Sequence, residues 1–183
     1  MTRLQTWNKN IVSSDLVYKL NPKNIHDLTR FENVVLKSCI NSSIQDQKDI
    51  IFGLVALELL TNQKAKVSRT RKSIAAFKTR KFMPISTKVT LRKKNLYNYL
   101  DFFICIVLPR LPQLKEFEKN SVIKAKTSLS IGLPNLTIFP QLTKESEQLP
   151  KNMGLTLTIN SNNIKSNTSL LLFLSEFQMP VIL

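Results

Sequence analysis

The fold of this chain is decided by residues 85–92, which read Ile-Ser-Thr-Lys-Val-Thr-Leu-Arg. Apolar side chains at Ile85, Val89 and Leu91 alternate there with polar or basic ones. Alternation with a period of two predicts a strand that has one face on a core and one face in water. Residues 64–68 alternate in the same way. We therefore expect two strands with basic exposed faces, joined by a loop at residues 70–84.

Helical and extended patterns surround this pair of strands. A Ser43-x-x-Asp46 capping signature precedes one apolar run at helical spacing, and Pro109 ends another. Asn167, or a neighbouring Ser, is placed to cap the last helix. The expected elements are helices at residues 45–61 and 96–108, strands at residues 129–133 and 155–159, and a closing helix at residues 167–177.

Strands and helices are mixed here without strict alternation, which predicts an α+β fold. We expect a mainly antiparallel sheet with helices packed on one face and a long basic loop between two central strands. Residues 1–183 are expected to form a single domain, with an N-terminal helical segment at residues 1–30 and the protruding basic loop at residues 70–84. A chain of 183 residues can bury a core without a disulfide or a metal.

The positive charge of the chain is concentrated in one segment. Between Leu59 and Leu100 there are twelve Lys or Arg residues and no Asp or Glu, and the whole chain has a net charge of +15. A one-signed segment repels itself and concentrates a polyanion against its surface. The pattern favours nucleic acid as the partner, with an anionic membrane surface as the alternative. The twelve residues are Lys64, Lys66, Arg69, Arg71, Lys72, Lys78, Arg80, Lys81, Lys88, Arg92, Lys93 and Lys94.

The loop also carries the side-chain types that RNA recognition uses. Lys and Arg neutralise phosphates, and aromatic rings stack on unpaired bases. Phe77 and Phe82 are either stacking rings or rings that anchor the loop in the core. Ser73, Ala75 and Ala76 are small enough to let the backbone of a partner come close.

Other functional classes find little support in the residues. Cys39 and Cys105 lack a C-x-x-C spacing, and His26 is the single histidine, whereas a zinc site needs four such ligands at short spacing. We expect both thiols to be small buried side chains. The longest apolar run, residues 102–108, is too short to cross a bilayer. The charged window has no carboxylate to hold Mg²⁺. A non-enzymatic protein without metal or cofactor is therefore expected.

A series of short motifs runs along nearly the whole chain. Leu-Leu-Thr-Asn-Gln-Lys at residues 59–64 precedes Arg-Lys-Ser-Ile-Ala-Ala-Phe-Lys at residues 71–78, which is the most specific of them. Further motifs lie at residues 83–85, 88–92, 97–101, 108–110, 129–132, 138–140, 154–159 and 177–180. In this order they resemble universal large-subunit ribosomal protein five of the bacterial type. Residues 55–59 are similar to versions encoded in mitochondrial genomes.

The resemblance implies a place and a set of partners. Members of this family sit in the central protuberance of the large ribosomal subunit and bind 5S rRNA and a neighbouring hairpin of the large rRNA. They extend the loop between two strands toward the elbow of the peptidyl-site tRNA. The resemblance therefore implies an organellar ribosomal protein, mitochondrial or plastid, with rRNA, 5S rRNA where the organelle retains it, peptidyl-site tRNA and neighbouring ribosomal proteins as partners.

The charge pattern and the resemblance together select the expected binding residues. The residues expected to bind rRNA are Lys64, Lys66, Arg69, Lys88, Arg92, Lys93, Lys124 and Lys126. The residues expected in the loop near tRNA are Arg71, Lys72, Ser73, Phe77, Lys78, Arg80 and Lys81.

The chain departs from the family pattern at several positions. Ala76, Ser86 and Lys93 stand where the family usually has glycine, and Ala65 stands where it has proline. A glycine position that needs a positive φ would be strained or remodelled by these side chains. The glycine-rich loop expected before Leu129 is replaced by the basic segment 118–126.

Overall fold

The computed structural model describes residues 2–39, 49–111, 122–124, 127–145, 153–164 and 167–179. They divide into two compact units, the first made of Met1–Val34, Leu91–Ile131 and Thr158–Leu183, and the second of Val35–Thr90 and Gly132–Leu157. The single domain expected over residues 1–183 stays a prediction. Every boundary between the units falls inside a strand, so no linker composition marks it along the chain.

The strands form one hydrogen-bonded order, β2-β3-β1-β6-β5-β4. Their bounds are β1 Arg30–Cys39, β2 Lys66–Arg69, β3 Pro84–Leu91, β4 Val122–Lys124, β5 Ser128–Leu133 and β6 Gly154–Asn162. The pairs β2–β3 and β4–β5 are antiparallel. The expected strands are confirmed, and with them the α+β class. One detail is corrected: β2 is an edge strand, so the basic loop does not join two central strands. An alternating pattern predicts which face of a strand is buried, but it does not predict which strands lie next to it.

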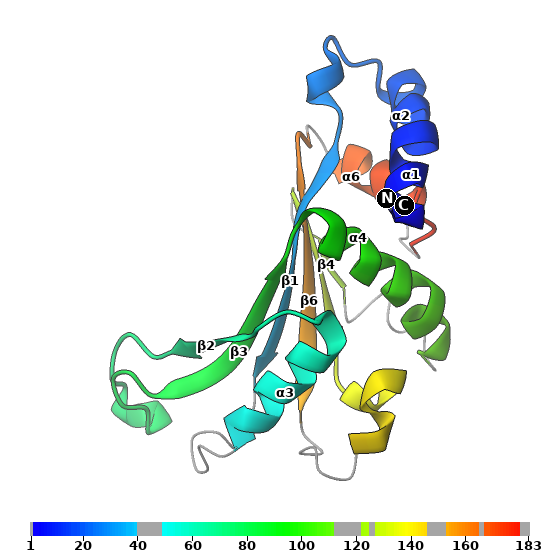
Figure 1. Ribbon diagram of the computed structural model, residues 1–183. Helices are drawn as coiled ribbons and strands as arrows, with labels where there is room; N and C mark the ends of the chain where they lie inside the picture. The colour runs from blue at the N-terminus through cyan, green and yellow to red at the C-terminus, as the bar shows by residue number, and fades with distance from the viewer. Residues whose placement is uncertain are drawn as a thin grey trace. The chain divides into compact units, whose positions relative to one another are not determined.

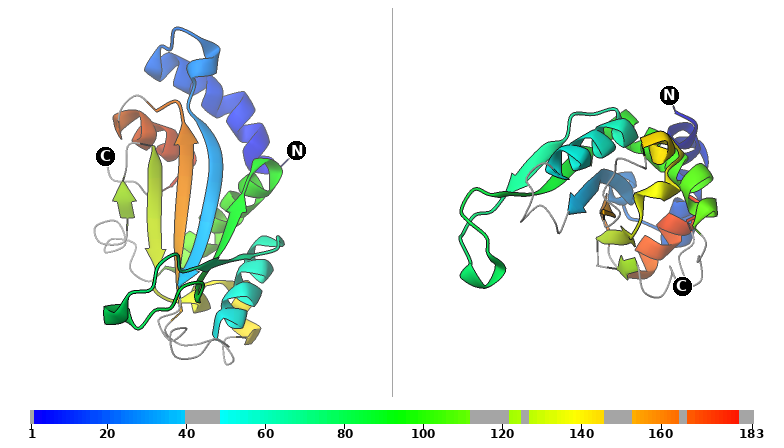
Figure 2. Two further views of the ribbon diagram at one scale, coloured as in Figure 1. Left: turned by 90° about the vertical axis from the view of Figure 1, so that its left-hand side faces the viewer. Right: turned by 90° about the horizontal axis from the view of Figure 1, so that it is seen from below.

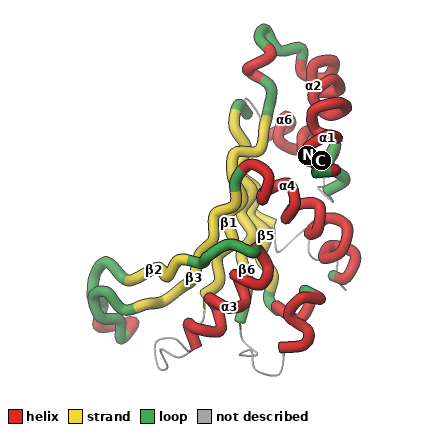
Figure 3. Tube along the Cα trace, viewed as in Figure 1, coloured by secondary structure: helices red, strands yellow, loops and turns green. Residues whose placement is uncertain are grey.

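Helices form where the apolar spacing predicts them (Figure 3). The N-terminal helical segment is α1 (Arg3–Trp7), a π-helical turn (Asn8–Val12) and α2 (Ser13–Leu20). The others are α3 (Asp49–Thr61), α4 (Lys93–Phe102) and α6 (Asn167–Ser175). α4 continues through a π-helical turn into a 3-10 turn, Leu108–Arg110, that holds Pro109. The capping signature at Ser43 and Asp46 lies outside the described residues.

In the first unit, helices cover one face of the strands (Figure 1). Phe31 of β1 contacts the rings of Phe173 and Phe177 at centroid distances of 4.6 and 4.8 Å, and Tyr97 of α4 at 6.1 Å. This aromatic cluster joins α4 and α6 to the sheet, because aromatic side chains bury the largest apolar areas. The side chain of Asn8 donates a hydrogen bond of 2.9 Å to the hydroxyl of Tyr97, which also fastens the N-terminal helices to α4.

The opposite face of β5 and β6 is polar. Ser130 of β5 and Thr158 of β6 share a hydrogen bond of 3.1 Å. The side chain of Asn160 donates a hydrogen bond of 2.7 Å to the side-chain oxygen of Asn33 in β1. Along β5, polar and buried residues alternate, and Leu129 and Ile131 belong to the core. This agrees with the alternating pattern predicted from the sequence, with one face on the core and one polar face.

In the second unit, α3 packs closely against β3. Gly53 lies at the contact, where an added Cβ would stand 3.0 Å from Oγ1 of Thr87 and 3.2 Å from Cε of Met153. The hydroxyl of Ser38 in β1 donates a hydrogen bond of 2.8 Å to the carbonyl of Gly154 in β6. These contacts join α3 to β3 and β1 to β6 in the unit from which β2 and β3 extend. Figure 2 shows the segment between β2 and β3 reaching beyond α3, the helix of the same unit.

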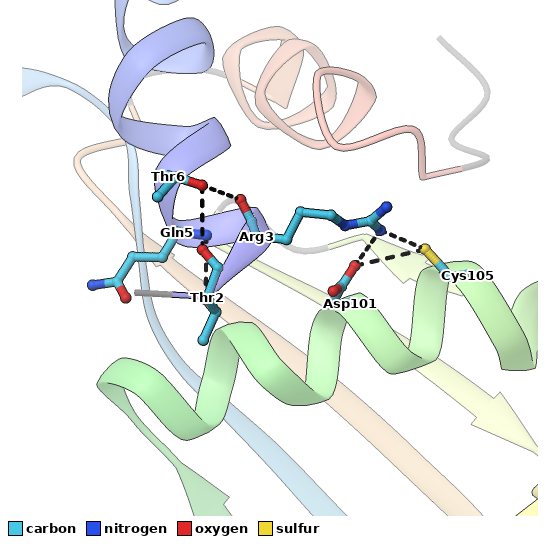
Figure 4. A network of polar contacts seen from close by, with 6 residues as sticks. All are labelled: Thr2, Arg3, Gln5, Thr6, Asp101 and Cys105. Atoms are coloured by element: carbon cyan, nitrogen blue, oxygen red, sulfur yellow. Dashed lines mark hydrogen bonds and ion pairs between the residues drawn. The ribbon is translucent and has the colours of Figure 1, made fainter.

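The two thiols are a correction to the sequence-based expectation. Cys39 and Cys105 are both exposed rather than buried. The guanidinium of Arg3 donates a hydrogen bond of 2.8 Å to Sγ of Cys105 and also pairs with Asp101 (Figure 4). The hydrogen bond with Asp101 raises the pKa of Arg3 above its ordinary value, and the contact with Cys105 adds to this. A small apolar side chain favours burial on average, but its place on the helix decides, and Cys105 lies on the outer side of the turn after α4.

Candidate nucleic-acid interface

The basic loop is an ordered finger, which we define as Thr70–Met83. Thr70 fastens its base: its amide donates to the carbonyl of Met83 at 2.9 Å, and its carbonyl accepts from the amide of Phe82 at 3.1 Å. The hydroxyl of Thr70 accepts from the amide of Met83 at 2.9 Å and donates to the carbonyl of Arg80. Thr70 therefore joins the two arms by hydrogen bonds to backbone groups at the point where the finger leaves β2 and β3.

The tip of the finger has its own hydrogen bonds. Ile74 and Thr79 pair across it, with two N–H···O=C bonds of 3.2 Å. Between them, Ala75–Phe77 forms a 3-10 turn that Lys78 ends in the left-handed conformation, at φ 52°. These backbone hydrogen bonds, and not packing against a core, define the shape of the tip. The side chains of the finger are left to face solvent.

Nearly every side chain of the finger is exposed. The five cations Arg71, Lys72, Lys78, Arg80 and Lys81 are all exposed, and among the residues that the structure describes none of them forms an ion pair with a carboxylate. The segment itself has no acidic residue. Unpaired cations at this density produce a positive potential that attracts a polyanion.

The aromatic rings of the finger settle an alternative that the sequence left open. Phe77 is 67% exposed and Phe82 is 64% exposed, so neither ring anchors the finger in the core. Ile74 is also exposed at the tip. Large apolar side chains that gather on an exposed loop mark an interaction surface. Both rings remain accessible to a partner.

Two of the predicted rRNA-binding lysines are brought together by the strand register. Lys66 of β2 stands opposite Lys88 of β3, and Ser68 stands opposite Ser86. Residues opposite each other point to the same face, and like charges in that position repel. Both lysines are exposed, as are Lys64 just before β2 and Arg69 at its end. The second unit therefore presents a basic strip, made of these four residues, next to its finger.

The other predicted positions do not join this strip within one unit. Arg92 and Lys93 belong to the first unit, at the start of α4, and both are exposed. Lys124 lies in β4, a strand that the sequence pattern does not predict, and Lys126 lies outside the described residues. Sequence reasoning also missed Thr70. Its only signal was a hydroxyl residue directly after a strand, which is too common to be informative.

Other kinds of site are not found in the described part of the chain. Across those residues, no group of His, Cys, Asp and Glu side chains is arranged to hold a metal ion. No helix in the same residues has the length and apolar character to span a membrane. What the described structure offers is an α+β protein with an exposed, carboxylate-free basic finger beside a basic strip.

Comparison with known proteins identifies the family. Residues 84–181 match the model of the C-terminus of the ribosomal L5 family. The chain is 33% identical over 181 residues to "Large ribosomal subunit protein uL5m" of Reclinomonas americana, an alignment that covers 99% of this chain and 98% of that protein. The chain therefore belongs to the L5 family of large-subunit ribosomal proteins, which confirms the resemblance seen in its motifs.

Relatives from bacteria and plastids are similar to a comparable extent. The chain is 32% identical to "Large ribosomal subunit protein uL5" of Buchnera aphidicola, with 98% of each chain covered. It is 30% identical to "Large ribosomal subunit protein uL5c" of Stigeoclonium helveticum, with 92% of each chain covered. The family is a structural component of the large ribosomal subunit and not an enzyme, which confirms the non-enzymatic role that the sequence predicts.

Proposed function

We propose that this protein binds rRNA in the central protuberance of an organellar large ribosomal subunit and extends its finger toward the peptidyl-site tRNA. The ribosomal RNA would be the large rRNA, together with 5S rRNA where the organelle retains it. The observation that carries the proposal is the finger itself: an ordered, exposed segment with five cations that no described carboxylate pairs with. Family membership supplies the large subunit as its setting.

The basic strip supports the rRNA part of the proposal. Lys66 and Lys88 face the same way across β2 and β3, where like charges repel and a counter-charge is needed; neither lysine forms an ion pair with a carboxylate among the described residues. Phosphates of a folded RNA meet that need, because each lysine neutralises a phosphate and releases a bound counterion. In this proposal Lys64, Arg69, Arg92, Lys93, Lys124 and Lys126 add further phosphate contacts.

The shape of the finger supports the tRNA part. Its tip is held by backbone hydrogen bonds rather than by packing, so it can reach a partner that lies away from the rRNA-bound strands. Phosphate contacts position a protein on nucleic acid, and rings or guanidinium planes stack on unpaired bases. The proposed contacts of the finger are Arg71, Lys72, Ser73, Phe77, Lys78, Arg80 and Lys81.

The tRNA role is tested by the double charge reversal Arg71→Glu with Lys78→Glu. We expect translation by ribosomes that carry this variant to fall several-fold, while incorporation of the protein into large subunits stays close to wild type. The reason is that both side chains lie on the finger and not on the strands. Translation is measured by peptide synthesis in organellar extracts, and incorporation by sedimentation of the subunits.

A matched control is Lys9→Glu with Lys23→Glu, which changes the charge by the same amount on exposed residues of the first unit. This control should leave translation unchanged. Unchanged translation in the finger variant would contradict the tRNA role, and equal loss in both variants would point to net charge alone.

The organellar setting is proposed as mitochondrial, with the plastid stroma as the alternative. Similarity to the uL5m protein of Reclinomonas americana supports the first, and similarity to the uL5c protein of Stigeoclonium helveticum keeps the second open. Fractionation of the source cells decides between them: the protein should co-sediment with large subunits from mitochondria. Recovery only with plastid ribosomes would overturn the mitochondrial assignment.

A further inference from the structure

A hollow lies at the base of the finger. Its volume is about 680 Å³, within the range of pockets that hold small organic groups. Four cations line it, Arg69, Lys78, Arg80 and Lys81, together with Phe82 and Met83. Among the described residues that form this lining, none carries a carboxylate. The hollow thus combines an aromatic ring, a thioether and concentrated positive charge, and we call it the Phe82 pocket.

Phe82 is held in the pocket in an unfavourable backbone conformation. Its φ is 66°, in the left-handed region, which a bulky side chain enters at a steric cost. The residue is 64% exposed, so burial in the core does not offset that cost. The hydrogen bonds of Thr70 to Phe82 and Met83 impose the conformation. Backbone strain of this kind clusters at active sites and ligand clamps.

The charges around the ring indicate what that partner is. Nζ of Lys81 lies 5.2 Å from the centroid of the Phe82 ring, which is within the reach of a cation–π contact. An accessible ring with Lys and Arg around it provides the two contacts that one nucleotide makes: the base stacks on the ring, and its phosphate pairs with a guanidinium. A base inside a duplex cannot stack in this way, because its faces are already covered by neighbouring bases.

We propose that the Phe82 pocket takes one unpaired nucleotide of RNA, with the base stacked on Phe82 and a flanking phosphate on Arg69 and Arg80. This proposal rests on the proposed RNA-binding function and names the chemistry that one part of the finger recognises. The nucleotide comes from rRNA or from tRNA, since both offer unpaired bases. Contacts of Lys64, Lys66 and Lys88 in the basic strip are independent of it, whereas Arg69 belongs to both the strip and the pocket.

The pocket is tested with the full chain and two oligomers of equal length and charge. One is a single-stranded oligoadenylate, and the other is its abasic counterpart, which keeps every phosphate and lacks every base. We expect wild-type protein to bind the oligoadenylate at least about fivefold more tightly, which is the lower end for one base–aromatic stack. Phe82→Gly should lose most of this preference, and Phe82→Trp should retain it. Fluorescence anisotropy at several salt concentrations gives the affinities.

Two controls separate recognition from folding. Glycine adopts a positive φ without strain, so Phe82→Gly should melt at the wild-type temperature or above it. Tyr18→Ala removes a ring that is 88% exposed on α2 of the first unit, and it should keep the preference for bases. A loss of preference in the Tyr18 variant equal to that in the Phe82 variant would overturn the pocket.

The failure of this inference differs from the failure of the proposed function. If neither oligomer binds in a salt-dependent manner, the RNA-binding function fails with it. If both bind with the same salt dependence but wild type shows no preference for bases, or Phe82→Gly keeps one, only the pocket is overturned.

The source of the nucleotide is found by ultraviolet crosslinking of isolated large subunits, with and without tRNA in the peptidyl site. A nucleotide attached to the tryptic peptide 82–88 without tRNA assigns rRNA, and one attached only in the presence of tRNA assigns tRNA. No attachment in either arm would contradict the pocket.

Discussion

Positive φ angles at non-glycine residues mark positions where the backbone conformation is sterically strained. In the described residues there are seven, and three of them, Asn21, Asn62 and Asn163, are asparagines, which tolerate this conformation. Lys93 does not share that tolerance. It is one of the positions where the sequence suggested a replaced glycine, and its φ of 51° shows that a left-handed residue is needed there. Ala76, at another of those positions, is not in this region.

Lys93→Gly should therefore stabilise the protein. Glycine enters the left-handed region freely, whereas other residues pay about 1–2 kcal/mol, so we expect a gain of about 1 kcal/mol in the free energy of unfolding. Lys94→Gly is the matched control, because Lys94 follows in the same helix with an ordinary φ and should lose up to about 1 kcal/mol. Urea denaturation measures both. A lower stability for Lys93→Gly would contradict the strain at that position.

The buried hydroxyl of Tyr99 makes the stability of the fold depend on pH in the alkaline range. Its hydroxyl is buried and has no hydrogen-bond partner among the described residues, and this burial raises the pKa of Tyr99 far above its ordinary value of about 10. The folded state keeps the proton at a pH where the unfolded chain releases it. The stability contributed by this difference is present below about pH 10 and is lost as the pH rises above it.

Tyr99→Phe should reduce the loss of folding stability at alkaline pH. Removing an unpaired buried hydroxyl should also raise the free energy of unfolding at pH 7 by about 1 kcal/mol. Guanidinium titrations near neutral pH and above the ordinary tyrosine pKa of about 10 compare this variant with wild type and with Tyr18→Phe, in which an exposed hydroxyl is removed. Burial also raises the pKa of Tyr97, opposed by the hydrogen bond from Asn8, so a smaller alkaline loss should persist. An unchanged alkaline slope would argue against the buried hydroxyl of Tyr99 as its source.

At the scale of elements, α3 and β3 are fitted to each other at Gly53. Helix propensity alone predicts that Gly53→Ala stabilises α3 by about 1 kcal/mol. The tertiary contact opposes this, because the new Cβ would stand 3.0 Å from Oγ1 of Thr87. Thr87 is buried and β-branched, so it cannot readily turn away.

We therefore expect Gly53→Ala to lower the free energy of unfolding by about 1 kcal/mol, as overpacked sites do. A double-mutant cycle with Thr87→Ala checks the cause: removing Oγ1 and Cγ2 should make the alanine at position 53 neutral or favourable. Additive effects of the two substitutions would show that the contact is not responsible.

For the molecule as a whole, the decisive property is the placement of charge. The net charge is +15, and twelve of the cations lie in one segment without an acidic residue. Binding of RNA should therefore be dominated by released counterions. If about six to ten phosphates are neutralised, affinity for a folded RNA should fall by roughly 10³ to 10⁵ between 50 and 200 mM salt. Filter binding over that range measures the slope, and an affinity that stays flat would contradict the electrostatic mechanism.

Elements whose side chains repeat with a local period were predictable from the sequence. β3, β5, β6 and α4 coincide with apolar spacing of about 2 or 3.6 residues, since that spacing records which face is buried. α3 was predicted from its apolar run, although its exposed side is also apolar, at Ile51, Val55 and Leu59. β4 was missed because three residues are too few to show a period. The division into two units could not be predicted because its boundaries lie within strands, where composition does not change.

By itself the sequence determined the α+β class, the segment that carries the charge and the family, because alternation, composition and motifs are all local records of what each residue faces. The tertiary structure alone decided that β2 is an edge strand, that Lys66 stands opposite Lys88, and that Thr70 fastens the finger. It alone also placed the rings of Phe77 and Phe82 in solvent. Such facts depend on which distant segments hydrogen-bond to each other, and no local pattern encodes that choice.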